Sequence, residues 1–170
     1  RLITGTNTVV VSSAAAVNRT NGFVEGNLNK NFALGTSTQT FEVGTNADYT
    51  PVSLTCTSVT TAGTLTVSSV DGDHPDIASG LIEPNNTVNS YWKMTVNGIV
   101  FSAFSTGQIA GTFNWVNADE DPLLDNTAIL KWYNNSTLAW TGSDQFDQVA
   151  EQNPVMTVTT SIAANLCTFT

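Results

Sequence analysis

Short segments of the chain alternate apolar and polar residues, and turn signals separate these segments at short intervals. In Pro51–Thr57, Val52, Leu54 and Cys56 fall on one face of an extended strand, while hydroxyl side chains fall on the other. A period of two is what a strand with one buried face requires, and no segment keeps a helical period for long. The same alternation recurs at 38–44, 63–68, 108–115 and 156–159.

Closely spaced turns and many short strands predict an all-β fold, a single antiparallel β-sandwich with short strands and tight turns. No linker composition divides the chain, so residues 1–170 are predicted to form one domain. Asn97-Gly98 predicts a two-residue hairpin between 92–96 and 99–101. Residues 1–12 are expected to hold a strand that is either peripheral or donated to a neighbour. The helix candidates are short, at 14–17 and 145–148.

Charge and composition exclude several classes of protein. The net charge is −9 and only 11% of residues are charged, so a phosphate backbone would be repelled and nucleic-acid binding is not expected. No apolar run reaches the ~20 residues that a membrane span needs. Thr, Ser and Asn are abundant, so hydroxyl and amide groups rather than charged groups hydrate the surface. This composition is typical of exported β-rich proteins. We therefore expect a secreted chain, either mature or one module of a longer exported protein.

Two acidic loops are candidates for chemistry. Asp119, Glu120, Asp121 and Asp125 place four carboxylates in one loop, a ligand type that suits Ca²⁺, although a solvated acidic loop is the simpler explanation. His74 is the only histidine and lies between aspartates at 71–76. It would serve as a general base only beside a nucleophile, and no Gly-x-Ser-x-Gly pattern accompanies it. We expect no enzyme and no cofactor apart from the calcium candidate.

Cys56 and Cys167 lie in separate predicted strands. In an exported protein a disulfide between them would close a long loop and stabilise the fold by about 4–5 kcal/mol on the chain-entropy model. Sequence spacing does not show that their Cβ atoms meet, so two buried free thiols are the alternative.

Aromatic residues gather in the second half of the chain. Trp132, Tyr133 and Trp140 are candidate glycan contacts, because exposed rings stack on sugars in carbohydrate-binding modules. The alternative is that these rings fill the core of the sandwich.

Three stretches occur in a familiar order. The opening segment 2–9 leads into the first of them. The three stretches are Val17–Lys30, Phe41–Val52 and Val88–Thr95. In this order they resemble the β-rich repeat modules of large secreted and cell-surface proteins of Bacteroidota and other environmental bacteria, over about Leu2 to Trp115. The chain departs from that pattern at Ser90, where the modules carry Arg, and after about Asp119. The resemblance implies export and a β-sandwich, but no catalytic residue and no ligand.

Together these observations predict a non-enzymatic extracellular structural protein, a subunit or module of a bacterial surface fibre or adhesin. Its expected partner is itself, or a neighbouring module, through β-strand contacts that the segment Arg1–Val11 would supply. The alternative function is a carbohydrate-binding module of a secreted protein, which would bind glycans through its aromatic rings.

Overall fold

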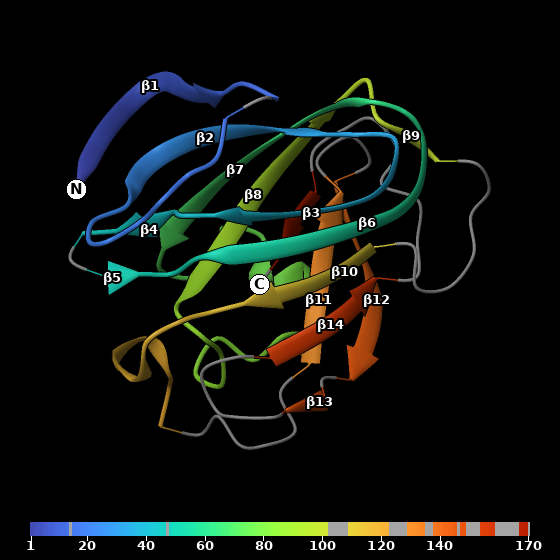
Figure 1. Cartoon of the computed structure of the whole chain (residues 1–170). Helices are drawn as coiled ribbons and strands as arrows, with labels where there is room; N and C mark the ends of the chain where they lie inside the picture. Colours follow the sequence, from blue (N-terminus) through green and yellow to red (C-terminus); the bar gives the residue numbers. More distant parts are fainter. Residues whose placement is uncertain are drawn as a thin grey trace.

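The fold is built from β-strands, in agreement with the all-β prediction (Figure 1). It is known from a computed structural model, which describes residues 1–13, 15–46, 48–101, 109–122, 129–134, 138–145, 147–148, 154–158 and 167–169. The larger sheet has seven strands in the order β1-β2-β7-β8-β15-β11-β12. Their bounds are β1 (Leu2–Val11), β2 (Val24–Phe32), β7 (Gly63–Asp71), β8 (Ser90–Asn97), β15 (Cys167–Phe169), β11 (Ile129–Asn134) and β12 (Ala139–Gln145).

A second sheet of six strands runs in the order β13-β14-β10-β6-β3, with β9 also paired to β6. Its strands are β13 (Asp147–Gln148), β14 (Pro154–Val158), β10 (Ile109–Phe113), β6 (Val52–Thr61), β3 (Gly35–Phe41) and β9 (Val100–Phe101). Two short strands, β4 (Gly44–Thr45) and β5 (Asp48–Tyr49), pair with each other, and 3₁₀ turns lie at η1 (Ile77–Gly80) and η2 (Asn117–Asp119). Among the described strand pairs, β1–β2 is parallel and the others are antiparallel.

One hydrophobic core draws on both sheets, because the alternating residues of each strand turn their apolar side inward. Val52, Leu54 and Cys56 on β6 are all buried, as the alternation predicted. From the larger sheet the core takes Leu28, Phe32, Leu65, Val67, Trp92, Met94 and Val96, and from the smaller sheet Phe41, Val52, Leu54, Cys56, Val59 and Phe113.

The predicted hairpin at Asn97-Gly98 is wrong. Gly98 has a positive φ of 78°, as a tight turn requires, but β9 pairs with β6 in the other sheet instead of returning along β8. The turn therefore carries the chain from one sheet to the other. The two helix candidates are also wrong where they are described: residues 15–17 are irregular, and Asp147–Gln148 forms β13.

The residues that carry the resemblance meet inside the molecule. Trp92, on β8, donates a hydrogen bond from Nε1 to the backbone oxygen of Thr50 at 3.0 Å, so the second and third stretches are joined in the core. Tyr91 points to the opposite face of the same strand and is also buried. In the described part of the chain, no helix is long and apolar enough to span a membrane.

Candidate functional site

The N-terminal strand β1 forms the outermost edge of the larger sheet and packs chiefly on β2 (Figure 1). It covers Leu2–Val11, in agreement with the strand expected in this segment, and carries no charged side chain. Leu2, Ile3 and Val10 remain 54%, 58% and 69% exposed. A long, charge-free edge with exposed apolar side chains is the kind of edge to which another strand adds.

A bulge divides β1 into two paired halves. Ile3 pairs with Glu25 and Thr8 with Asn27, so the intervening residues of β1 lie opposite Gly26 alone. The Thr4 hydroxyl fills this gap, where it accepts a hydrogen bond from the backbone N–H of Asn27 at 3.1 Å. A side chain in β1 thus satisfies a donor that the interrupted ladder would leave unpaired.

Polar contacts of the first two residues hold the beginning of β1 in place. The Arg1 guanidinium lies 2.8 Å from Oε2 of Glu25, and it also donates to the backbone oxygen of Asn46. Glu25 Oε2 is buried and has no partner in hydrogen-bond geometry, so its stabilisation depends on the Arg1 charge. The backbone N–H of Leu2 donates to the oxygen of Phe23 at 2.9 Å.

The inner side of β1 does not fill the space beneath it. An open pocket of about 220 Å³ lies between β1, the connection 12–23 and β2. Val9 and Val11 line it from β1, and Leu28 faces it from β2. Its other lining residues are Val17, Asn18, Arg19, Asn21, Gly22, Phe23, Val24 and Glu42. The packing of β1 on its own molecule is therefore incomplete.

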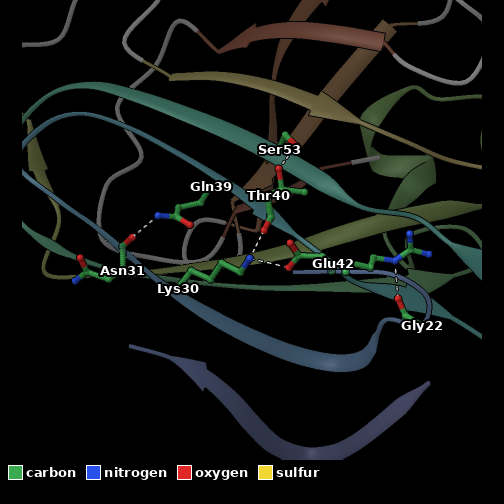
Figure 2. Close-up of polar contacts among 8 residues, drawn as sticks. Gly22, Lys30, Asn31, Gln39, Thr40, Glu42 and Ser53 are labelled. Carbon is green, nitrogen blue, oxygen red and sulfur yellow. Dashed lines mark hydrogen bonds and ion pairs between the residues drawn. The ribbon is translucent and has the colours of Figure 1, made fainter. Parts of the chain in front are cut away.

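Strand β2 is anchored to the rest of the protein by a buried ion pair. Lys30 is 4% exposed, and its Nζ lies 2.6 Å from Oε2 of Glu42 and donates to the backbone oxygen of Thr40 (Figure 2). Gln39 adds a hydrogen bond from Nε2 to the backbone oxygen of Asn31 at 3.0 Å. These contacts tie β2 to β3 and to the residue that follows it, independently of β1.

The acidic loop is docked against the loop that leads into β8. Asp119 accepts a hydrogen bond from the Ser90 hydroxyl at 2.9 Å, and Glu120 accepts one from Nε1 of Trp115 at 2.7 Å. Burial raises the pKa of Asp119 above its ordinary value, although the Ser90 hydrogen bond opposes that rise. The two carboxylates thus point to separate protein donors.

Asp121 is the most fully hydrogen-bonded of these carboxylates. It accepts from the backbone N–H of Thr87 at 3.0 Å and from Nδ2 of Asn89 at 2.9 Å. Burial acts to raise the pKa of Asp121, but these hydrogen bonds outweigh it and the pKa is lowered. The Thr87 hydroxyl also lies 2.8 Å from Asp73, so the two acidic loops meet. The described residues contain no cluster of His, Cys, Asp or Glu arranged for a metal; Asp125 lies outside them, and the calcium site stays a prediction.

His74 lies in an aromatic cluster. Its ring centroid is 5.1 Å from that of Tyr91, 4.6 Å from Tyr133 and 5.0 Å from Trp140. Its Nδ1 accepts a hydrogen bond from the backbone N–H of Asp76 at 3.1 Å, which requires that nitrogen to carry no proton. Burial lowers the pKa of His74, so it is neutral near pH 7. The histidine therefore serves as a packed element of this cluster.

The glycan candidates whose side chains are described differ in how far they are buried. Tyr133 is 3% exposed, and Trp140 is half-buried over the 3₁₀ turn η1, where its Nε1 donates to the backbone oxygen of Asp76 at 2.8 Å. Trp132 belongs to β11, but its side chain lies outside the described residues. Trp140 is therefore the described candidate that is partly exposed.

Cys56 is buried on β6, and burial raises its thiol pKa to about 12. Its thiol is free in the structure, while Cys167 lies on β15 with its side chain outside the described residues. The disulfide between them stays a prediction.

Lys30, Glu42 and Thr4 are not among the candidate residues that the sequence suggested. Alternation contained a signal for the first of these, because Lys30 occupies the same face as the buried Leu28 and Phe32. A lysine at an inward position requires a buried anion, and Glu42 supplies it. For the bulge at Thr4 the sequence offered only Gly26, a glycine that permits a bend or bulge, because the register between the two strands decides where a bulge forms.

No protein-family model, no curated protein and no solved structure matches this chain.

Proposed function

We propose that the chain is a structural, non-enzymatic module of an extracellular bacterial surface fibre or adhesin, and that copies join through β-strand contacts at β1. The observation that carries the proposal is the character of this edge. It has no charged residue and no Pro between Leu2 and Val11, and its outer side has no strand partner among the described residues. Soluble proteins commonly protect such edges with charge, so an unprotected one suits a strand partner.

In this proposal the two sheets are the layers of a single antiparallel β-sandwich. The supporting observation is that one buried core takes residues from both of them. An extracellular location is supported by the low charge content and by the resemblance of residues 2–115 to secreted repeat modules.

The test uses the full chain, whose assembly is followed by sedimentation velocity and negative-stain imaging with and without a calcium chelator. Ile3→Lys and Val10→Lys place charges on exposed positions of β1 and are expected to abolish assembly without unfolding the protein. Leu34→Lys is the matched control, because Leu34 is 64% exposed and lies outside β1. Single particles of the unmodified chain under all conditions would contradict the proposal, and loss of filaments on chelation would support calcium at the acidic loops.

A carbohydrate-binding module is the second candidate. Its support is that Trp140 is partly exposed and that its ring meets the Tyr133 ring edge-to-face, at a centroid distance of 5.2 Å. Affinity electrophoresis in polysaccharide gels tests it: Trp140→Ala should remove any retardation that the unmodified chain shows. Retention that survives Trp140→Ala would assign the binding to another surface.

A further inference from the structure

The attachment of β1 to its own molecule consists of pairing with one strand, a few polar contacts and the packing of Val9 and Val11 against the core. Most of its side chains are exposed, and only Thr4, Val9 and Val11 are half-buried. The pocket beneath Val9 and Val11 shows that even the inner face is not close-packed. Within β1, the contacts with the core that detachment would break are those of Val9 and Val11.

The site that receives β1 is formed without it. β2 pairs on its other side with β7, from Leu28 with Val67 to Phe32 with Gly63, and the Lys30–Glu42 ion pair fixes it to the second sheet. The edge of β2 would therefore keep its shape, with a row of unpaired backbone groups, if β1 left it.

The connection 12–23, between β1 and β2, is held by side-chain contacts at its β2 end and is exposed at its β1 end. Near β2, the Arg19 guanidinium lies 3.6 Å from the centroid of the Tyr49 ring, and its Nε donates to the oxygen of Gly22 at 2.6 Å. Near β1, the segment 12–18 is exposed where it is described and consists largely of Ser and Ala. Small exposed residues are suited to absorb a change of backbone direction, and a fully extended connection 12–23 would span on the order of 40 Å.

We infer that β1 is exchanged between copies: β1 of one molecule lies on β2 of a second molecule, in the parallel register seen within the single chain. The inference rests on the proposed function, because it specifies how neighbouring copies join. The occupant is argued from the structure itself, since the edge of β2 already receives this segment, and β1 of a second copy would meet the same donors and the same pocket. Exchange also keeps the Thr4 hydroxyl opposite Gly26, which an unrelated strand would not supply.

Cysteine cross-linking tests this arrangement. Thr8 and Asn27 are register partners, so Thr8→Cys chains are mixed with Asn27→Cys chains under assembly conditions and oxidised. All chains carry Cys167→Ser, while Cys56 is kept because it is buried and its pKa is about 12. The control mixes Thr8→Cys with Asn31→Cys, which changes the same residue type on the same face of β2 but pairs with Thr64 of β7 and not with β1.

Exchange predicts disulfide-linked chains in the mixture of Thr8→Cys with Asn27→Cys. Their yield should be at least tenfold above that in the control mixture of Thr8→Cys with Asn31→Cys. A series of linked species of increasing size would support an extended assembly. A linked dimer alone would support strand exchange but contradict the formation of a fibre. Assembly without inter-chain links would overturn the exchange and leave the proposed function intact. Absence of any assembly in the unmodified chain would overturn both.

A second arm uses no engineered cysteine. Val9→Asp impairs the strand and leaves the receiving edge of β2 intact, whereas Gly26→Ala impairs that edge and leaves the strand intact. Each variant alone should stay monomeric, and an equimolar mixture should give one-to-one dimers by native mass spectrometry. A mixture that stays monomeric, while the unmodified chain assembles, would overturn the exchange.

Discussion

Gly26 on β2 lies so close to Thr4 on β1 that a Cβ atom at position 26 would overlap the Thr4 hydroxyl. Gly26 also has φ of 117°, a conformation that other residues rarely adopt. The bulge in β1 and the glycine in β2 are therefore two halves of one contact, in which Thr4 accepts the N–H of Asn27. This contact holds β1 on β2 together with the Arg1–Glu25 ion pair.

Gly26→Ala should loosen β1 without unfolding the core. Backbone strain and the overlap with Thr4 are expected to cost about 1–3 kcal/mol, concentrated on the β1–β2 pairing. Hydrogen exchange of the amides in 2–11 should accelerate, while those of β7 keep their protection. Gly5→Ala is the control, because Gly5 has φ of 58° but no atom near the added Cβ, and it should have the smaller effect. Equal protection of β1 in Gly26→Ala and the unmodified chain would contradict the role of this contact.

Val9→Ile should tighten β1 by filling part of the pocket beneath it. The added methylene is expected to stabilise the pairing by about 0.5–1 kcal/mol and to slow hydrogen exchange in 2–11. Val10→Ile adds the same group to a side chain that is 69% exposed and should change little. A destabilised Val9→Ile chain would show that the pocket does not accept the larger side chain.

Lys30→Met should be strongly destabilising, because it leaves the Glu42 carboxylate largely buried without its cation. The expected loss is about 3–5 kcal/mol in the free energy of unfolding, measured in urea. The double variant Lys30→Met/Glu42→Leu should recover most of this loss, since it removes the orphaned charge. If the double variant were no more stable than Lys30→Met, the ion pair would not explain the defect.

Acidification should destabilise the protein through His74. Its folded-state pKa is lowered by burial, chiefly, and by the Lys93 charge, while Asp76 opposes the shift. The unfolded chain therefore binds a proton at His74 before the folded chain does, and stability falls as the pH drops below about 6.5. Protonation of Nδ1 would also remove its hydrogen bond from the N–H of Asp76.

The measurement compares urea unfolding at pH 7.5 and pH 5.5 for the unmodified chain and for His74→Gln. The difference between the two pH values should shrink in the variant, which retains the carboxylates. Asp119, whose pKa is raised, favours folding at lower pH and is present in both chains, so it cancels in the comparison. An equal pH dependence in both chains would exclude His74 as the cause.

Alternation was sufficient to locate many of the strands. The inward positions of β6 and β7 were predicted from their apolar residues, because a period of two assigns every second side chain to the core. Alternation did not predict which strand pairs with which. Asn97-Gly98 has the composition of a hairpin turn, yet Val100–Phe101 pairs with β6, since long-range contacts decide between two sheets that a local turn does not distinguish.

Composition and periodicity are local properties, so the sequence alone predicts an all-β protein with low charge, an apolar face on several strands and a charge-free opening strand. Long-range packing placed β1 parallel to β2, Thr4 against Gly26 and Lys30 beside Glu42. It also brought His74 among the aromatic rings and gave each of Asp119, Glu120 and Asp121 its own protein donor. Apart from the contact between Trp115 and Glu120, these contacts join residues far apart in the chain, and their geometry depends on strand register, which is set by the packing of the whole core.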